Sequence, residues 1–493
     1  MQGTTHPLLL QLNTRCWLRE LGELLHHPVH FGNVPGHLIL EWKELGFTHI
    51  WAMGVWTTGA LSRRIALDDP ALQEQFHSTH PGWTDQDVMG SPYAIAAYEV
   101  PSILGGESGL ATFRKQLHRH GLKLILDFVP NHVAVDHPWV LHKPALFVAS
   151  NQTFQGSFQA MTGKGVLWIA HGRDPYFPPW KDVAQLDYRN EEVRLEMKKI
   201  LLSLASRCDG VRCDMAMLVV NEVFRKTWGP KVIDSEPPSY EFWPEAIPEV
   251  KKCHPKFLFL AECYWGFDTI LQIQGFDFTY HKEVLDSLIA GDAPPLLHRL
   301  ASLPKEHLSR CAHFLENHDE PRIASLLAPE KTKIAALVKL ALPGMRMIYE
   351  KQMEGARLRM PVQFSRWPSE ALDETLRAFY LNLLSTLKQT SIGRGDWHVL
   401  QPLGWPDNPS ARNLLILQWS SNNGSFELVV LNFSAQSAQC RVYLKIEGLE
   451  LHQWSIRDLL GKEHHLRDGP LLISEGLYLN VQGHATHLFQ FKG

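Results

Sequence analysis

Short, almost continuously apolar runs alternate with helical patterns through the first 390 residues of the chain. Runs of this kind are typical of strands that are buried on both faces of a parallel sheet. They lie at residues 8–13, 48–53, 122–129, 210–215, 257–263, 276–280, 311–317 and 345–349. Apolar positions at helical spacing lie between them, at 36–46, 108–121, 190–205 and 331–342. Eight strands that alternate with helices predict a (β/α)8 barrel of the TIM type.

A doubly wound open sheet is the alternative arrangement of the same elements. Such a sheet usually carries a glycine-rich phosphate-binding turn after its first strand. The first apolar run continues as Leu-Gln-Leu-Asn-Thr-Arg-Cys-Trp over residues 10–17, which contains no glycine. The closed barrel is therefore the favoured prediction.

The spacing of the runs also predicts the domain organisation. Residues 54–107 are interpreted as a long loop, and the Pro-, Gly- and aromatic-rich stretch after the third strand as a small inserted subdomain, with an ordered long loop as the alternative. Alternating positions beyond residue 390 predict an antiparallel β-sandwich. The expected division is a catalytic barrel over 1–133 and 209–390, subdomain B with its following helix over 134–208, and a C-terminal β domain over 395–493.

Composition and charge exclude several classes of protein. A net charge of −4 gives no basic excess for binding nucleic acid or an anionic membrane, and no run approaches the roughly 20 apolar residues of a membrane span. The N-terminus lacks the basic and apolar regions of a signal peptide. Seven cysteines without a CxxC pair suggest reduced, buried thiols, so we expect a cytoplasmic protein. The 16 tryptophans hint at carbohydrate, although most are expected in the core.

The segment Asp209–Met215 carries the strongest local signal for chemistry. Arg212 and Asp214 are two residues apart, so in a strand they point to the same side. A carboxylate among apolar neighbours is costly unless a cation compensates it. Arg212 is therefore expected to hold Asp214 ionised, as a carboxylate nucleophile requires. The alternative is a structural ion pair at the end of a strand.

Other acids and histidines follow the predicted strands. The C-terminal ends of barrel strands form the active face, so these side chains are expected at one mouth. They are Asp127, Asn131 and His132 after the third strand, Arg212 and Asp214 at the fourth, Glu262 at the fifth, and Asn317, His318 and Asp319 at the seventh. Three carboxylates at one mouth repel each other, but they suit a reaction with an oxocarbenium-like transition state.

Four of these segments also resemble a known family. Residues 124–133, 209–215, 259–265 and 314–322 resemble, in order and each on its expected strand, the four signature regions of the α-amylase superfamily, glycoside hydrolase family 13. Residues 90–100 and 340–355 resemble the family's segments around the second and eighth strands. The resemblance implies a retaining glycosidase or transglycosylase that acts on α-glucosidic bonds of α-glucans or maltooligosaccharides by double displacement.

The resemblance also implies roles for single residues. Asp214 matches the nucleophile, Glu262 the general acid/base and Asp319 the third carboxylate, which bonds substrate hydroxyls. The resemblance implies a raised pKa for Glu262, which apolar neighbours such as Tyr264 and Trp265 would provide.

Further residues match substrate-binding or structural positions of the family. His132 and His318 match histidines that bond sugar hydroxyls, and Arg212 would orient the nucleophile. Tyr93 or Tyr98 is expected to stack on the sugar ring, with plain packing as the alternative.

Asp127 matches an aspartate that is mostly structural. Asn131 matches a calcium ligand of many amylases. No cofactor is expected, and calcium is not expected, because the rest of such a site cannot be recognised in the sequence.

Two departures from the family pattern leave the substrate open. Amylases usually carry Lys-His where this chain has Met217 and Leu218, and relatives that act on short sugars often carry Asp where it has Ala94. An α-glucosidase or a trehalose- or sucrose-converting enzyme is therefore an alternative. A catalytically inactive sugar-binding relative is another. A metal-dependent barrel hydrolase is a third, but the first strand lacks the His-x-His that it would need.

Overall fold

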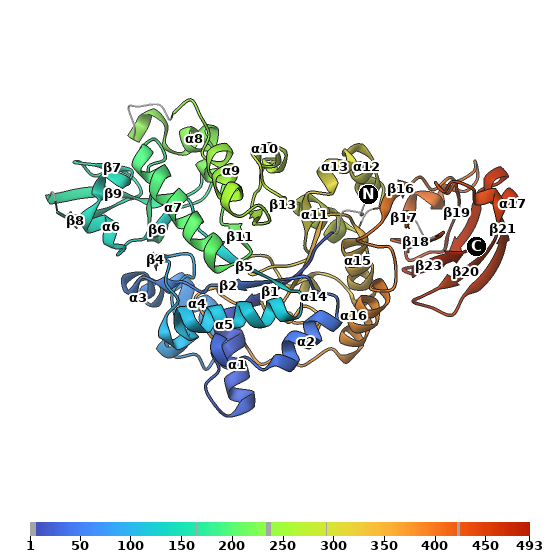
Figure 1. The fold of residues 1–493 in the computed structure, drawn as a ribbon, viewed down its shortest axis with the longest axis horizontal. Helices are drawn as coiled ribbons and strands as arrows, with labels where there is room; N and C mark the ends of the chain where they lie inside the picture. The colour runs from blue at the N-terminus through green and yellow to red at the C-terminus, as the bar shows by residue number, and fades with distance from the viewer. Residues whose placement is uncertain (1–5, 164, 233–237, 292, 422–423) are drawn as a thin grey trace.

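The computed structural model describes residues 6–163, 165–232, 238–291, 293–421 and 424–493. Eight parallel strands close into a barrel in the order β1-β2-β5-β11-β12-β13-β14-β15, and β15 pairs with β1 (Figure 1). The strands are β1 (Leu8–Asn13), β2 (His49–Met53), β5 (Lys123–Phe128), β11 (Gly210–Cys213), β12 (Leu258–Ala261), β13 (Phe278–Tyr280), β14 (Cys311–His313) and β15 (Met345–Tyr349). The barrel prediction is confirmed, and the open sheet is excluded.

Burial explains why the strands appear as apolar runs. Every residue of β1 and β15 is buried, because the barrel interior covers one face of each strand and the helices cover the other. The four predicted helices are present as α2 (Gly36–Glu44), α5 (Gly106–Arg119), α7 (Glu191–Arg207) and α15 (Pro329–Ala341), and α16 (Glu374–Leu387) follows the last barrel strand. The barrel region also contains α1 (Thr14–Leu25), α8 (Asn221–Val232), α9 (Trp243–Cys253), α10 (Asp268–Ile273), α11 (Lys282–Ala290), α12 (Ala293–Ser302), α13 (Lys305–Leu308) and α14 (Ile323–Leu326).

The interpretation of residues 54–107 as a long loop was wrong. Two helices lie there, α3 (Ala60–Asp68) and α4 (Pro70–Thr79), together with the short strands β3 (Thr57–Thr58) and β4 (Ile95–Ala97). The Asp69 carboxylate caps α4 by accepting hydrogen bonds from the backbone of Ala71 and Leu72. An Asp cap followed by Pro is a recognisable start signal, but the helices are short and their apolar periodicity is weak.

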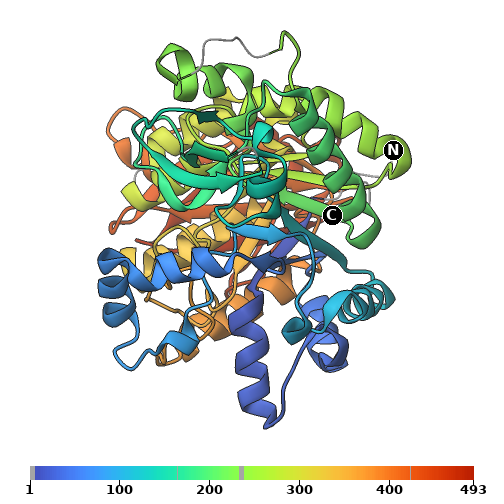
Figure 2. The same ribbon diagram turned by 90° about the vertical axis from the view of Figure 1, so that its left-hand side faces the viewer.

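An antiparallel sheet is inserted after the third barrel strand, and so the inserted segment is more than an ordered loop. Its strands are β6 (His132–Ala134), β7 (Ala149–Ser150), β8 (Ser157–Thr162), β9 (Gly165–Gly172) and β10 (Trp180–Gln185). The short helix α6 (Pro138–His142) lies beside β8. Because β6 begins just after β5 ends, the sheet lies at the C-terminal ends of the barrel strands (Figure 2).

The last hundred residues form a β-sandwich at the opposite end of the molecule (Figure 1). Its larger sheet contains β16 (Asp396–Leu400), β17 (Leu414–Ser420), β18 (Ser425–Asn432), β23 (Thr486–Lys492), β20 (Gln453–Asp458) and β21 (His464–Asp468). A second sheet pairs β19 (Ala438–Val442) with β22 (Leu477–Val481), and α17 (Gly469–Ser474) precedes β22. The apolar inner faces of the two sheets share one core.

The sandwich packs against the end of the barrel where the strands begin. The indole of Trp419 in β17 donates a hydrogen bond to the carbonyl of Ala341 at the end of α15, over 2.8 Å. The ring of His6, which precedes β1, meets the same indole edge-on. The sandwich is therefore fixed at the end opposite to the inserted sheet.

The buried thiols agree with the expectation from composition. All seven cysteines are free, and only Cys253 is exposed. Within the described ranges, no helix is both long enough and apolar enough to cross a membrane.

Candidate active site

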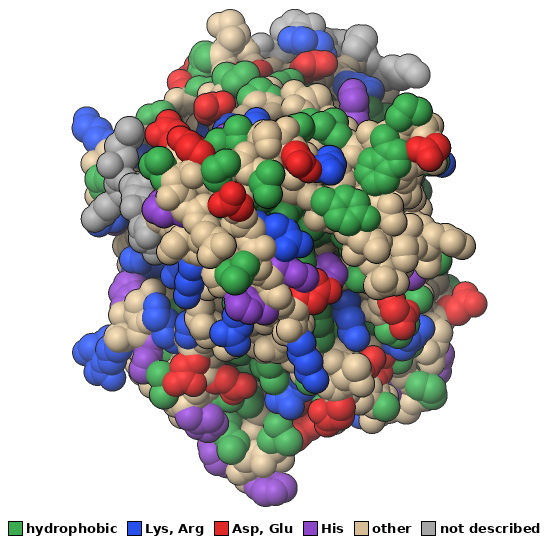
Figure 3. Space-filling model, turned by 90° about the vertical axis from the view of Figure 1, so that its right-hand side faces the viewer, with side chains coloured by type: hydrophobic (Ala, Val, Ile, Leu, Met, Phe, Trp, Pro, Cys, Tyr) green, Lys and Arg blue, Asp and Glu red, His purple; other side chains and the backbone are tan. Residues whose placement is uncertain are grey.

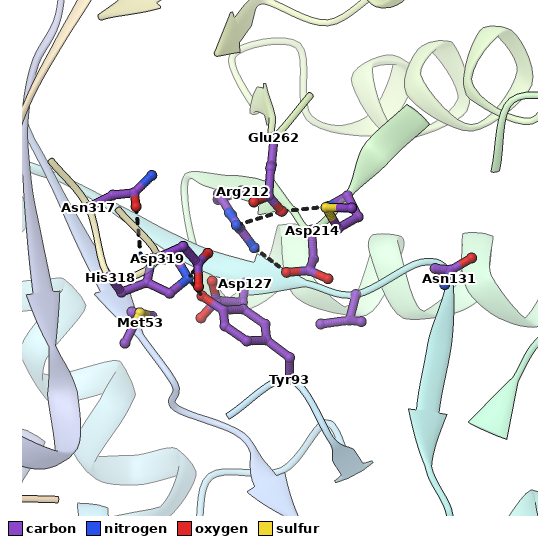
Figure 4. Close-up of polar contacts among 12 residues, drawn as sticks. Met53, Tyr93, Asp127, Asn131, Arg212, Asp214, Glu262, Asn317, His318 and Asp319 are labelled. Atoms are coloured by element: carbon purple, nitrogen blue, oxygen red, sulfur yellow. Dashed lines mark hydrogen bonds and ion pairs between the residues drawn. The ribbon is translucent and has the colours of Figure 1, made fainter. Parts of the chain in front are cut away.

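The three predicted carboxylates meet at the C-terminal mouth of the barrel. Asp214 directly follows β11, Glu262 directly follows β12, and Asp319 lies in the loop after β14. In Figure 4 their carboxylates lie around the guanidinium of Arg212. The barrel fold thus brings together three acids that lie up to 105 positions apart in the sequence.

Arg212 pairs with two of these acids. Its Nη1 lies 2.5 Å from Oδ1 of Asp214, and its Nη2 lies 2.7 Å from Oε2 of Glu262. The arginine is completely buried, and the rings of Trp51 and Tyr93 lie about 5 Å from its guanidinium carbon. The sequence predicted the pair with Asp214 but not the second pair with Glu262.

The environment of Asp214 contains opposing effects. Burial raises the pKa of Asp214, and the neighbouring charge of Arg212 lowers it. Burial prevails, so the pKa remains above its ordinary value. Arg212 therefore favours the ionised carboxylate, as predicted, but it offsets only part of the cost of burial.

Glu262 has the raised pKa that a general acid requires. Its Oε2 accepts a hydrogen bond from the backbone N–H of Met215 over 2.7 Å, and its Oε1 accepts one from the hydroxyl of Tyr264 over 3.0 Å. Burial, reinforced by the charge of Asp214, raises the pKa of Glu262 to about 7 against the effect of Arg212. Glu262 therefore still holds its proton in a large fraction of molecules at neutral pH.

Trp265 contacts a residue of the inserted segment, and its part in burying Glu262 stays a prediction. Its ring meets that of Tyr176 edge-on at 4.8 Å, and 38% of the residue is exposed. Its backbone is left-handed, with φ +59°. Tyr264 remains as the aromatic neighbour that contacts the acid.

Asp319 and His318 form the third part of the site. Oδ2 of Asp319 lies 3.0 Å from Nε2 of His318, and the Tyr93 hydroxyl lies 2.6 Å from the same nitrogen. Burial raises the pKa of Asp319, but the charges of His318 and Arg212 together outweigh it, and the pKa falls to about 2. Asp319 is therefore ionised throughout the neutral range. The side-chain oxygen of Asn317 caps this turn by accepting from the backbone of Asp319.

His132 occupies a different position from His318. It is buried at the start of β6, and its ring packs against Trp180 at 5.3 Å. Burial lowers the pKa of His132 to about 3, so the ring is neutral. Within the described parts of the chain, its side chain makes no hydrogen bond to any of the three carboxylates, and its role toward a substrate stays a prediction.

The two candidate tyrosines differ in their contacts. Tyr93 lies in the site, with its ring 5.3 Å from that of His318. The hydroxyl of Tyr98 instead exchanges hydrogen bonds with the backbone of Val129, and its ring packs against Trp56. These contacts favour Tyr93 as the residue beside a sugar ring and packing as the role of Tyr98.

Asp127 makes the contacts of a structural residue. Its carboxylate accepts hydrogen bonds from the indole of Trp51 and from the backbone of Gly54, at 3.0 and 2.8 Å. Both oxygens are therefore used to hold the segment that follows β2. These contacts agree with a structural role for Asp127 and not a catalytic one.

Asn131 does not have the surroundings of a calcium ligand. Its side-chain oxygen accepts a hydrogen bond from Nε2 of Gln185 over 2.9 Å, and its Nδ2 donates one to Oε1 of Gln185 over 3.1 Å. It lies apart from the carboxylate cluster in Figure 4. Across the described residues, no group of three or more His, Cys, Asp or Glu side chains is arranged to hold a metal ion. The side-chain oxygen of Asn131 therefore already has a partner, and the absence of calcium stays a prediction.

Met217 and Leu218, which stand where amylases usually carry Lys-His, are part of the core. Met217 and Leu218 lie in a 3₁₀ turn, Ala216–Val219, and are 0% and 2% exposed. Ala94 is also completely buried.

A cavity of about 530 Å³ is lined by residues that follow Glu262 in the chain, although none of the three carboxylates lines it. Its lining includes Met215, Tyr264, Trp265, Phe177 from the inserted segment, and Lys282 from α11. Phe177 is 62% exposed, and the sequence did not single it out. The only sequence signal for Phe177 was its place next to Tyr176 in a Pro- and Gly-rich insertion after the third strand.

Gln11 is a second residue that sequence reasoning missed. Its side-chain amide lies 2.9 Å from Nδ1 of His318, on the side of the ring away from Asp319. A lone glutamine in an apolar strand gives no signal for this role, because its partner is 307 positions away.

Comparison with known proteins agrees with this geometry. The family model described as "Alpha amylase, catalytic domain" matches residues 42–366. Alpha-amylase MalA of Haloarcula japonica is 25% identical over 375 residues, which are 74% of this chain and 50% of that protein. Alpha-amylase 3 of Dictyoglomus thermophilum is 22% identical over 351 residues, 67% of this chain and 61% of that protein. The chain therefore spans only half to three fifths of these curated relatives.

A solved structure shows the same fold. The maltogenic α-amylase AmyB of Thermotoga neapolitana, described as noncanonic, superimposes with a TM-score of 0.69 at 18% identity, over 99% of both chains. Because the family model covers well over half of the chain and the eight-stranded barrel carries the expected carboxylates at its mouth, this chain belongs to the α-amylase family.

Proposed function

We propose that this chain is a retaining α-glycosidase or transglycosylase that acts on α-glucosidic bonds of α-glucans or maltooligosaccharides. The observation that supports this most directly is the pair of carboxyl groups on one guanidinium, Asp214 and Glu262 on Arg212. Glu262, with a pKa of about 7, can donate a proton, and Arg212 favours the ionised form of Asp214. Two carboxyl groups with divided roles are what double displacement requires.

The first half-reaction forms a covalent intermediate. Asp214 attacks the anomeric carbon while Glu262 protonates the glycosidic oxygen, so the leaving sugar departs as an alcohol. Asp319, ionised by its neighbours, accepts hydrogen bonds from substrate hydroxyls that strengthen as positive charge develops on the ring. Arg212 keeps Asp214 in place for this attack.

The second half-reaction uses the same two groups in reverse. Glu262, now ionised, removes a proton from the acceptor, and the acceptor oxygen displaces Asp214 from the anomeric carbon. In this proposal, the cavity lined by Met215, Tyr264 and Trp265 receives the leaving sugar and the acceptor. Water as the acceptor gives hydrolysis, and a second sugar gives transfer.

A product analysis tests the proposal. The purified chain is incubated with soluble starch, maltooligosaccharides, isomaltose, sucrose and trehalose, and the Asp214→Asn protein serves as the blank. Proton NMR of the first products should show α-anomers from starch or maltooligosaccharides, because two inversions retain the configuration. Products longer than the substrate identify transfer.

Three outcomes would contradict the proposal. Initial β-anomeric products would exclude double displacement at Asp214. Turnover of sucrose or trehalose alone would show that the chain is an enzyme for short sugars and does not act on α-glucans. No turnover on any sugar, with maltooligosaccharide binding detected by calorimetry, would indicate an inactive sugar-binding relative.

A further inference from the structure

The outer face of the small sheet β19–β22 in the C-terminal sandwich carries exposed aromatic rings. Tyr478 is 44% exposed and Tyr443 is 48% exposed. Trp405, which is 37% exposed, lies beside Tyr478 with the ring centres 6.5 Å apart and the planes 32° from parallel. Large aromatic side chains are usually covered in a protein without a ligand for them, so such a group indicates a binding surface.

Strand pairing places these side chains on one face. Arg441 is paired with Tyr478 across the ladder, and Leu403 bridges to Arg441 from the other side. Directly paired residues point to the same face of a sheet. Cys440 and Leu479, which alternate with them, are buried in the core of the sandwich. Trp405 and Tyr478 therefore lie together on the outward face, and the exposed Tyr443 follows the buried Val442 at the end of β19.

The polar groups on this face are those that recognise hydroxyls. Gln439 and Asn480 form the next pair along the ladder, on the same outward face. The guanidinium of Arg441 donates hydrogen bonds to the backbone oxygen of Glu475 and to its carboxylate, over 2.9 and 3.1 Å. Glu475 thereby neutralises Arg441, the only charged residue of the strands β19 and β22. The face therefore does not favour an anionic ligand. Figure 3, which looks onto this end of the molecule, shows apolar side chains at the surface among polar and charged ones.

We propose that this platform, defined by Trp405, Tyr443, Tyr478, Gln439 and Asn480, is a second binding site for an α-glucan chain. The apolar faces of glucose units stack on the rings, and the amide groups bond the hydroxyls at the edges. The platform lies at the end of the molecule opposite to the barrel mouth, so it holds polymer without taking part in cleavage. The choice of α-glucan as occupant rests on the proposed function, and the aromatic rings and amides of the face suit a neutral polyhydroxylated ligand.

Adsorption to granular starch tests this site without turnover. The Asp214→Asn protein is compared with versions that also carry Trp405→Ala, Tyr478→Ala or both, and the free protein is measured after sedimentation of the granules. Each substitution should raise the apparent Kd about two- to tenfold, the range expected for one aromatic contact. Tyr478→Phe keeps the ring and should retain most of the binding. Leu466→Ala, at an exposed apolar residue of β21 outside the platform, is the matched control and should change nothing.

Activity measurements separate this inference from the proposed function. In the active protein, Trp405→Ala and Tyr478→Ala should reduce the initial rate on granular starch and leave kcat/KM on maltotriose unchanged. Unchanged adsorption in the double variant would overturn the second site while leaving the proposed function intact. If sedimentation velocity shows that the double variant loses a dimer and adsorption is unchanged, the face is a contact between two copies of the chain. Failure of the wild-type protein to cleave any α-glucan would instead refute the proposed function, whatever the adsorption shows.

Discussion

The guanidinium of Arg212 lies 2.7 Å from the carboxylate of Glu262, while its other terminal nitrogen holds Asp214. One buried cation therefore balances both of the acids that the reaction would use. Its charge lowers the pKa of each, and burial raises the pKa of each. The protonation states of the two groups consequently depend on the same residue.

Replacement of Arg212 by Met should impair activity and stability together. Removing the cation leaves two buried carboxyl groups uncompensated, so the pKa of both rises. We expect kcat/KM to fall by at least about 100-fold, and the free energy of unfolding at pH 7 to fall by about 3–5 kcal/mol. Kinetics and denaturant titration measure the two effects. Arg377→Met, at an exposed position of α16, is the control. An Arg212→Met protein with normal activity would contradict the role given to the arginine.

The pH dependence of kcat/KM should show an alkaline limb near pH 7. Glu262 must be protonated to act as the acid and its pKa is about 7, so activity should be high below this value and fall above it. The Glu262→Gln protein cannot ionise at this position. It should lose this limb and retain about 10⁻² to 10⁻⁴ of the activity. An unchanged alkaline limb in Glu262→Gln would assign the titration to another group.

The sequence was sufficient for the barrel because its strands are buried on both faces and therefore appear as apolar runs. It was also sufficient for the acids that directly follow those strands, such as Asp214 and Glu262. It missed contacts that depend on distant pairs, for example Gln11 with His318 and Arg212 with Glu262. Nothing in the local sequence encodes these partners, since the closure of the barrel brings them together.

Acid should destabilise the protein as buried neutral histidines become charged. Burial, aided by Arg346, lowers the pKa of His6 to about 4, whereas an unfolded histidine titrates near 6.5. Between these values the unfolded chain binds more protons, so stability falls as the pH drops from 6.5 to 4. The contribution of His6 at pH 5 is on the order of 2 kcal/mol.

The His6→Asn protein tests this contribution. Nδ1 of His6 accepts a hydrogen bond from the backbone of Gly344 over 2.8 Å, and an asparagine oxygen can take this place without titrating. The difference in Tm between pH 7 and pH 5 should therefore be smaller in this protein than in the wild type. An equal difference in both proteins would show that His6 is not one of the groups responsible.

A chelator should not affect the fold or the activity. Asn131 and Gln185 satisfy each other's amides where many amylases use an asparagine to bind calcium, so incubation with EDTA should leave the Tm and kcat unchanged. Gln185→Ala should lower the free energy of unfolding by about 3 kcal/mol, because it leaves the buried amide of Asn131 without its partner. Added calcium should not restore this loss. A fall in Tm with EDTA that calcium reverses would disprove the prediction.

The pairing of β1 with β15 has a consequence for how the chain is made. On one side, β1 pairs with β2, but on the other side the partners of residues 8–11 are residues 346–349, and the backbone of Asn13 is held by the carboxylate of Glu350. At 5–20 residues per second, a ribosome needs roughly 20 to 70 s to deliver those partners. Throughout that time the nascent sheet has an unpaired edge, which can join strands of neighbouring chains. Slower initiation or a chaperone that covers this edge should therefore raise the yield of folded protein more than any change at the finished surface.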